Sequence, residues 1–298
     1  MTDKAASVLA RLKNRAKQSG KPLQVHLRLF CQEEFLRRLS LSRYADNLIL
    51  KGGMFVYTLT QFESRPTKDV DFLLKQLAGS VESIQNVIRE ILAIDTGNDY
   101  IWFEAEGFET ISLMREYPGV SFQLIGHIKD TKTPFTVDLG IDDVVVPGTI
   151  KRSIPVQLEG FTEPVISTYS LESTIAEKYE AILQRLEMTS RMKDFYDIYY
   201  LSNMFDYDGR VLQQAIWETL QKRGTQYNKD SLQTIGYFVG DAGMQNKWKQ
   251  YLKAQKLKEP EFDVVVQAML KFLGPVWDAI VREDEFFGNW QGRNAEWH

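Results

Sequence analysis

The alternation of apolar and polar residues divides the chain into a first part with mixed periods and a second part with a helical period alone. Over the first 46 residues, apolar side chains recur three or four positions apart, which predicts helices, and Pro22 fits the start of one. Strand and helix patterns then follow one another as far as residue 160. The predicted strands are 48–50, 70–74, 101–103, 111–115, 121–128, 134–141 and 156–158, and the predicted helices are 54–59 and 81–93.

Only a helical period continues beyond residue 167. The change near the loop with Gly160 and Pro164 predicts a boundary between two lobes, residues 1–160 and residues 161–298. A chain of 298 residues is also longer than a usual single domain. We therefore predict an α+β fold, in which a mixed sheet with flanking helices precedes a helical C-terminal lobe. The helices predicted in that lobe are 170–186, 191–203, 209–222, 242–254, 261–273 and 275–287.

The composition narrows the class of protein. Hydrophobic residues make up 44% and charged residues 26%, which is ordinary for a globular protein, and we expect a cytoplasmic protein without a membrane partner because no signal peptide or long apolar span is visible. The only cysteine, Cys31, excludes an internal disulfide and a cysteine zinc site. It lies in a helical pattern, so a buried small side chain is favoured over a catalytic thiol. The histidines are too scattered for a histidine metal centre: His26, His127 and His298.

Charge is distributed unevenly along the chain. The net charge of -4 and the pI of about 5.6 argue against a grip on nucleic acid by the whole molecule. The N-terminal segment is nevertheless basic, because Asp3 is the only acid among several cations before Glu33. A solvated helix face is the favoured interpretation, and an arm that contacts a phosphate backbone is the alternative. The cations are Lys4, Arg11, Lys13, Arg15, Lys17, Lys21 and Arg28.

Two carboxylates, Asp69 and Asp71, accompany the apolar strand pattern of residues 70–74. Residues i and i+2 of a strand point to the same face, so these side chains are expected side by side. Burial of adjacent ionised carboxylates without a partner is costly. Mg²⁺ prefers oxygen ligands of this kind and is often held by one or two carboxylates together with substrate phosphates. Taken alone, the pair is also compatible with the exposed end of a strand.

A glycine pair between a strand and a helix supplies the context. Gly52 and Gly53 follow the strand 48–50 and precede the helix 54–59, so backbone N–H groups can approach a phosphate closely there. The start of the helix adds a partial positive charge. A tight turn explains two glycines equally well when they are considered alone. Followed by an aspartate pair on the next strand, they predict a triphosphate-binding turn beside a metal site.

A third acid, Asp138, lies in the middle of a predicted strand between Val137 and Leu139. A lone acid on the polar face of a strand is usually solvated. Beside two aspartates of a metal site, Asp138 is either a third metal ligand or a general base, and the sequence leaves both roles open. Asp142 and Asp143 are predicted to be loop residues.

Two helices of the second lobe carry further candidates. Lys178 lies in SLESTIAEKYEAILQR, where a lysine on the helix surface is the ordinary interpretation. Asp194 and Asp197 lie near the start of SRMKDFYDIYYL and share a helix face, a position that also suits the helix dipole. Because large apolar residues surround these acids, they need partners. We predict that Lys178 and Asp194 pair between two antiparallel helices.

Four segments of the chain together resemble the AbiEii-type nucleotidyltransferases, which are toxins of abortive-infection (phage-defence) and toxin–antitoxin systems. They are LKGG, RPTKDVDF, LESTIAEKYEAI and RMKDFYDIY, and the resemblance extends from about Leu48 to Leu201. It implies a DNA polymerase β-like nucleotidyltransferase lobe followed by a helical C-terminal lobe. It also implies a metal-dependent enzyme that uses Mg²⁺, with Mn²⁺ as an alternative, and that transfers a nucleotide from an NTP to an acceptor hydroxyl.

The resemblance assigns the glycine turn to nucleotide binding. It implies that Lys51, Gly52 and Gly53 face the triphosphate and that Arg65 is a further phosphate contact. The wider superfamily usually has Gly-Ser at this turn. Gly53 offers only its backbone N–H where a serine hydroxyl would also donate to a phosphate. Gly-Gly variants look normal within the AbiEii-type family, and whether this one reduces activity is left open.

The resemblance also implies a catalytic set. Asp69 and Asp71 would hold Mg²⁺, Lys178 would contact the nucleotide phosphates, and Asp194 would complete the set. Some relatives modify the 3′ end of tRNA, so tRNA is the first expected acceptor, and a toxin implies a cognate antitoxin protein as a partner. Two alternatives stay open: transfer to a protein hydroxyl, and an NTP-binding module without turnover.

Overall fold

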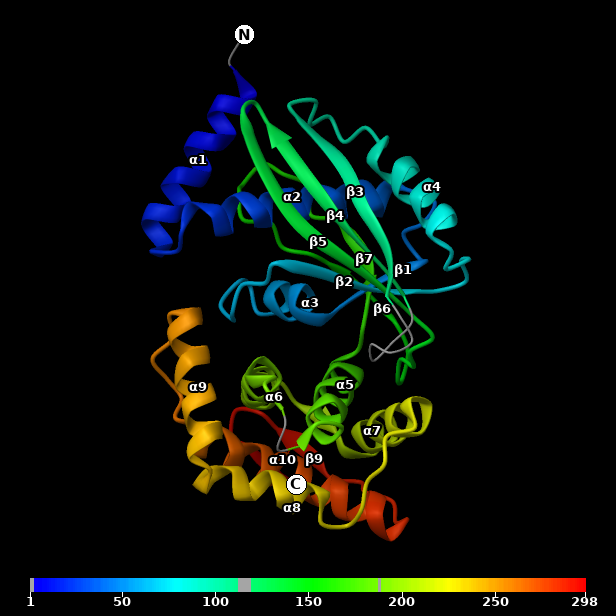
Figure 1. Ribbon diagram of the computed structural model, residues 1–298, viewed down its shortest axis with the longest axis vertical. Helices are drawn as coiled ribbons and strands as arrows, with labels where there is room; N and C mark the ends of the chain where they lie inside the picture. The colour runs from blue at the N-terminus through cyan, green and yellow to red at the C-terminus, as the bar shows by residue number, and fades with distance from the viewer. Residues whose placement is uncertain (1–2, 112–118, 187–188) are drawn as a thin grey trace. The chain divides into compact units, whose positions relative to one another are not determined.

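The computed structural model describes residues 3–111, 119–186 and 189–298 (Figure 1). The chain forms two compact units. The sheet unit comprises Met1–Asp143 and Thr149–Tyr169, and the helical unit comprises Val144–Gly148 and Ser170–His298. The strand predicted at 111–115 lies outside the described residues, apart from Ile111, which ends β3.

The sheet unit is built on a mixed sheet of seven strands in the order β3-β4-β5-β2-β1-β7-β6. Its β5/β2 and β1/β7 pairs are parallel, and the other neighbours are antiparallel. The strand predicted at 156–158 is wrong, and two short strands lie on either side of it instead. The strands are β1 (Leu48–Lys51), β2 (Asp69–Leu74), β3 (Ile101–Ile111), β4 (Gly119–Ile128), β5 (Thr131–Ile141), β6 (Ile150–Ser153) and β7 (Val165–Thr168).

Four helices complete this unit, and their ends follow local signals. The side chain of Asp3 accepts a hydrogen bond from the amide of Ala6 at the start of α1, and Gly20 ends the helix with a φ of 68°. Ser80 caps α4 in the same way as Asp3 caps α1, through the amide of Ser83. These predicted helices are confirmed. They are α1 (Lys4–Ser19), α2 (Leu23–Leu41), α3 (Gly52–Leu59) and α4 (Val81–Leu92).

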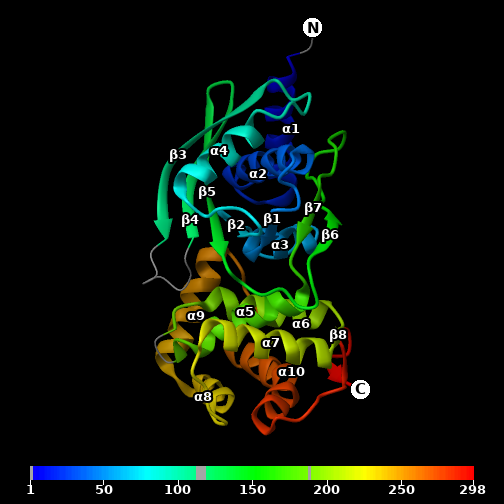
Figure 2. The ribbon, with the colours of Figure 1, turned by 90° about the vertical axis from the view of Figure 1, so that its right-hand side faces the viewer.

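Helix α2 packs against one face of the sheet, as both views of the unit show (Figures 1 and 2). The ring of Phe35 on α2 lies 6.1 Å from the ring of Phe72 on β2. Cys31 approaches β4 so closely that a Cβ at Gly126 would lie 2.5 Å from its sulfur. Because side chains alternate along a strand, the neighbours of Phe72 in the sequence point to the opposite face. The aspartates of β2 therefore lie on the face that does not pack against α2.

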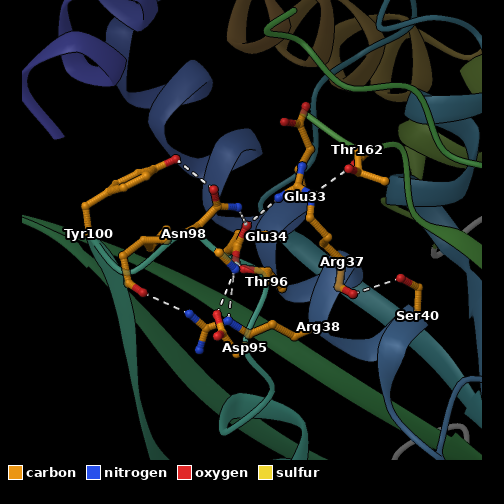
Figure 3. Close-up of polar contacts among 12 residues, drawn as sticks. Glu33, Glu34, Arg37, Arg38, Ser40, Asp95, Thr96, Asn98, Tyr100 and Thr162 are labelled. Atoms are coloured by element: carbon orange, nitrogen blue, oxygen red, sulfur yellow. Dashed lines mark hydrogen bonds and ion pairs between the residues drawn. The ribbon is translucent and has the colours of Figure 1, made fainter. Parts of the chain in front are cut away.

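Helix α2 carries a buried cluster of charged residues around Glu34 (Figure 3). Glu34 accepts hydrogen bonds from Thr96 at 2.5 Å and Asn98 at 2.8 Å, and forms ion pairs with Arg37 and Arg38. A second nitrogen of Arg38 donates to a backbone carbonyl of β3 at 2.8 Å. A buried carboxylate needs such partners to offset its lost hydration. The cluster ties α2 to the connection between α4 and β3.

Glu33, the neighbour of Glu34, has fewer hydrogen-bond partners for its carboxylate. It is fully buried, and one carboxylate oxygen accepts a hydrogen bond of 2.9 Å from the backbone amide of Gln157. Its other oxygen has no hydrogen-bond partner in the described part of the chain. Burial raises the pKa of Glu33 to about 8, although the Gln157 amide and the Arg37 guanidinium act in the opposite direction. Glu33 is therefore mostly protonated at neutral pH.

In the helical unit, α5, α6, α7 and α9 lie where the sequence pattern predicts helices. The unit also contains elements that the pattern did not predict. The short helix α8 and a sheet of three short strands, in the order β10-β9-β8, were not predicted. The elements are α5 (Leu171–Leu183), α6 (Met192–Met204), β8 (Tyr207–Asp208), α7 (Gly209–Arg223), α8 (Ser231–Tyr237), η2 (Phe238–Gly240), α9 (Ala242–Gln255), α10 (Phe262–Arg282), β9 (Asn289–Gln291) and β10 (Glu296–Trp297).

The two helices predicted at 261–273 and 275–287 are wrong, because one helix, α10, runs through Pro275. Proline inside a helix costs about 3 kcal/mol. Here Phe272 and Trp277 are buried on either side of it, and their packing holds the helix together. By length and composition α10 could cross a membrane, but half of its apolar stretch is buried inside the protein and it packs against α6, α7 and α8. It is the core helix of this unit.

Candidate functional site

The turn between β1 and α3 requires glycine at Gly52 for two reasons. Its φ is 65°, which a side chain disfavours, and a Cβ there would lie 2.2 Å from a carboxylate oxygen of Asp71. A Cβ at Gly53 would lie 2.9 Å from the Thr67 hydroxyl and 3.7 Å from an Arg65 guanidinium nitrogen. The fold thus brings together the glycine turn, the aspartate strand and the loop that precedes it. Arg65 itself is buried.

The aspartates of β2 alternate with its core residues. Val70 and Phe72 are 0% exposed, whereas Asp69 and Asp71 are half-buried on the opposite face. This arrangement explains how two acids can belong to a hydrophobic strand. In the register of β2 with β5, Asp71 pairs with Asp138, and Asp69 pairs with Thr136. Asp71 and Asp138 are therefore lateral neighbours.

The donors on this face suit a hard divalent cation. Asp69, Asp71 and Asp138 offer carboxylate oxygens on two adjacent strands. Across residues 3–111, 119–186 and 189–298, no group of three or more histidine, cysteine, aspartate or glutamate side chains is arranged to enclose a metal ion. A site of one or two carboxylates completed by substrate phosphates does not need such a cage. The residues present fit that kind of Mg²⁺ site.

Lys51, at the end of β1, is buried in an ion pair. Its ammonium lies 2.5 Å from Asp143 and 3.5 Å from the Tyr169 hydroxyl, and 5.1 Å from the centre of the Tyr169 ring. Asp143 follows β5 in a loop, as predicted, but its pairing with Lys51 was not predicted. In the register of β1 with β2, Lys51 stands opposite Asp71. The charge of Lys51 therefore lies beside the aspartate strand.

In the helical unit, Lys178 is not a surface lysine. It is buried on α5, and its ammonium lies 3.2 Å from Asp194 and 2.5 Å from Asp197, both on α6. Arg191 also contacts Asp194, at 2.5 Å. Burial acts to raise the pKa of Asp194, but Lys178 and Arg191 outweigh it and lower the pKa to about 2. The predicted Lys178–Asp194 pair is confirmed.

Asp197 is a member of this cluster that the sequence analysis placed on the same face as Asp194 but did not count among the site residues. It is 0% exposed, and the Lys178 ammonium lies closer to Asp197, at 2.5 Å, than to Asp194, at 3.2 Å. The i, i+3 spacing with Asp194 among large apolar residues was the signal that pointed to it. The cluster of Lys178, Asp194 and Asp197 lies within the helical unit, and the glycine turn and aspartate strand lie within the sheet unit.

Cys31 is confirmed as a buried side chain. It is 1% exposed, and burial raises the pKa of its thiol to about 12, so it is not a nucleophile at neutral pH. His26 is also engaged in the interior, 2.8 Å from the Ser19 hydroxyl and 2.9 Å from the Gln157 side chain. Neither residue takes part in the candidate site.

Some cations of the basic N-terminal segment are exposed, and others are held by hydrogen bonds to the rest of the sheet unit. Lys13, Arg15 and Lys17 are exposed on α1. Lys21 is held at the end of α3, where its ammonium donates to the Phe62 carbonyl at 2.9 Å and to the Tyr57 hydroxyl at 3.2 Å. With Lys4 at its start, α1 carries four exposed cations that an anionic partner could contact.

The comparisons with known proteins agree with this fold. A family model described as nucleotidyl transferase AbiEii toxin, type IV toxin–antitoxin system, matches residues 34–281. MenT4, a nucleotidyltransferase toxin from Mycobacterium tuberculosis H37Rv, has 16% sequence identity and a TM-score of 0.54, and the match covers 92% of this chain and 98% of MenT4. JHP933 from Helicobacter pylori has 13% identity and a TM-score of 0.48, with 87% of this chain and 93% of that chain covered.

No curated protein matches the chain. At its level of identity, the likeness to MenT4 shows a shared fold, which is the predicted α+β fold of a nucleotidyltransferase toxin. The family model, by contrast, matches most of the chain. The chain therefore belongs to the AbiEii family, the nucleotidyltransferase toxins of type IV toxin–antitoxin systems.

Proposed function

We propose that this protein is a toxin that transfers a nucleoside monophosphate from an NTP to the 3′ end of tRNA, with Mg²⁺, in the cytoplasm. The observation that carries the proposal is the contact of Gly52 with the Asp71 carboxylate, on a strand whose register places Asp138 beside Asp71. This geometry puts a turn that can bind phosphate directly against carboxylates that can hold a cation.

The nucleotide is bound by the glycine turn. Gly52 and Gly53 open α3, so their N–H groups and the positive end of the helix dipole can meet the triphosphate. Arg65 lies against Gly53 and adds a guanidinium suited to phosphate oxygens. Lys51 adds positive charge next to the turn while Asp143 fixes its position. The Thr67 hydroxyl lies close to Gly53 but donates to the Asp69 carbonyl at 3.2 Å, so it holds the loop rather than standing in for the serine hydroxyl of the wider superfamily.

Asp69 and Asp71 would hold the metal, with Asp138 as either a third ligand or the general base, and Mg²⁺ or Mn²⁺ bound there would neutralise charge on the phosphates. The acceptor hydroxyl oxygen forms a bond to the α-phosphorus in line with the bond that breaks, and pyrophosphate leaves with that bonding pair. The proton of the hydroxyl passes to a base, and Asp138 is available for that role if it is not a metal ligand.

Lys178 is proposed to stabilise negative charge on the triphosphate, with Asp194 as a member of the same catalytic set. In the helical unit, Asp194 and Asp197 hold the ammonium of Lys178 in one place. A lysine that is already oriented loses less entropy when it binds a phosphate than a mobile surface lysine would. The proposed role therefore uses the ion pairs rather than competing with them.

The acceptor is proposed to be tRNA because of the exposed cations on α1. Lys13, Arg15 and Lys17 can contact a phosphate backbone. The net charge of the whole chain is -4, so attraction of RNA has to come from a local group of cations such as this one. A protein hydroxyl is the second candidate, since the turn and the carboxylates would serve any acceptor hydroxyl. Family membership implies a cognate antitoxin as a further partner.

The acceptor is tested by incubation of the enzyme with each α-³²P-labelled NTP, Mg²⁺, and either total RNA or total protein. The proposal predicts label in a tRNA-sized band. Periodate oxidation of the tRNA beforehand destroys the terminal diol and should remove that label. Label in a protein band would instead support the second candidate, and tight NTP binding without pyrophosphate release would support a binding module.

A further inference from the structure

A row of four polar side chains crosses four neighbouring strands of the sheet. Lys51 on β1 pairs in register with Asp71 on β2, Asp71 pairs with Asp138 on β5, and Asp138 pairs with Ser121 on β4. Residues that pair in register point to the same face of a sheet and lie about 5 Å apart. The two central acids of the row are therefore flanked by a cation on one side and a hydroxyl on the other.

Ser121 is bonded to the nearer acid. Its hydroxyl donates a hydrogen bond of 2.6 Å to Oδ1 of Asp138. This distance is typical of a hydroxyl that donates to an ionised carboxylate, which is a stronger bond than one between neutral groups. The residues on either side of Ser121 in β4, Val120 and Phe122, are each 1% exposed. Ser121 is therefore fixed in place by a buried strand and acts as a rigid donor.

Such a donor restrains the direction of the Asp138 carboxylate. Two ionised carboxylates that are lateral neighbours repel each other, and a side chain with two free torsions can rotate to relieve the repulsion. Mg²⁺ requires near-ideal octahedral geometry, so it discriminates strongly between well-placed and badly placed oxygens. A hydrogen bond on Oδ1 limits this rotation of the Asp138 carboxylate.

We propose that Ser121 is a positioning residue, which holds the Asp138 carboxylate at a fixed separation from Asp71 so that both can bind one divalent cation. This inference rests on the proposed function. It assigns Asp138 as the third metal ligand, where the sequence left the choice between ligand and base open. It also explains why a serine occupies an outward position of β4 directly beside the acids.

The test compares Ser121→Ala, Ser121→Thr and a matched control, Gln123→Ala. Gln123 is exposed on the same face of β4, and its partners in register are Thr136 on β5 and Glu106 on β3, neither of which is an acid of the candidate site. Mn²⁺ is titrated into each protein, with and without each NTP, and free Mn²⁺ is measured by electron paramagnetic resonance. Nucleotide transfer is measured in parallel as a function of Mg²⁺ concentration.

Loss of a hydrogen bond to a charged group predicts about ten- to a hundredfold weaker Mn²⁺ binding by Ser121→Ala, and a similar rise in the Mg²⁺ concentration for half-maximal transfer. Ser121→Thr keeps the hydroxyl and should restore both values, and Gln123→Ala should match the wild type. The inference is overturned if Ser121→Ala binds Mn²⁺ as the wild type does, or if Gln123→Ala weakens binding equally. If the wild type transfers nucleotide and only these variant results fail, the proposed function survives. If the wild type neither binds Mn²⁺ nor transfers nucleotide, both are refuted.

Discussion

Replacement of Lys178 by methionine tests the buried charge cluster of the helical unit. Methionine keeps the length and apolar stem of the side chain and removes only the ammonium. Asp194 and Asp197 both lose this ammonium, which lies 3.2 Å and 2.5 Å from them, while Arg191 still contacts Asp194 at 2.5 Å. Because Asp197 is 0% exposed, water cannot replace that cation.

Removal of one partner of a buried ion pair costs about 3–5 kcal/mol. That is a large share of the roughly 5–15 kcal/mol by which a domain is usually stable. With a dependence of about 2 kcal/mol per molar urea, a loss of about 4 kcal/mol lowers the unfolding midpoint by about 2 M. The tryptophans Trp248, Trp277 and Trp290 are buried in this unit, so their fluorescence reports its unfolding in urea.

Two further variants make the result interpretable. Lys249→Met removes an exposed lysine from α9 and should change the free energy of unfolding by less than about 0.5 kcal/mol. Asp197→Asn in the Lys178→Met background removes one of the two buried carboxylate charges that faced the ammonium and should recover part of the loss. If Lys178→Met costs less than about 1 kcal/mol, the ammonium of Lys178 does not stabilise the buried carboxylates and our reasoning is wrong. Kinetic effects of any Lys178 variant have to be judged with this stability loss in view.

Two other predictions concern the sheet unit. Gly52→Ala should lower nucleotide transfer at least a hundredfold, because the added Cβ would displace Asp71. Gly20 has a similar φ of 68° with nothing within 4 Å of an added Cβ, so Gly20→Ala should cost only backbone strain, about 1–2 kcal/mol of stability. Equal transfer by both variants would argue against the close approach of Gly52 and Asp71. Glu33 has its pKa raised from 4.5 to about 8, so the stability it contributes is full below pH 4.5 and is lost as pH rises towards 8. Wild-type stability should therefore fall by roughly 1.4 kcal/mol per pH unit relative to Glu33→Gln between pH 6 and 7.5, and parallel urea midpoints would show that Glu33 does not titrate there.

The sequence predicted the elements whose signals are local. Alternation of apolar and polar residues identified β4 and β5, and the glycine pair marked the start of α3. In the structure, an Asp or Ser cap marks the start of α1 and α4. The break expected in α10 was wrong because the cost of Pro275 in a helix is offset by the packing of residues far away in sequence. Strands β6 and β7 are four residues each, too short to show a period, and were missed for that reason.

The sequence predicted the residue types of the candidate site and a few of its neighbours, but not the neighbours that strand order and register bring together. Asp69 and Asp71 follow from their spacing, whereas the lateral pairing of Asp71 with Asp138 depends on strand order and register. Ser121 and Asp143 acquire their roles only because distant strands bring them to an acid and a lysine. A serine within a strand and an aspartate in a loop are too common to be singled out from sequence alone.

The central claim, that the carboxylates beside the glycine turn carry nucleotide transfer, is tested most directly with Asp71→Asn. This change keeps the size of the side chain that lies against Gly52 and removes its charge. Purified tRNA is incubated with Mg²⁺ and each α-³²P-labelled NTP, and label at the 3′ end is counted for the wild type and the variant, after circular dichroism has shown equal folding. We predict label with the wild type and a loss of at least a thousandfold with Asp71→Asn. Transfer by the folded variant at the wild-type rate would contradict the account.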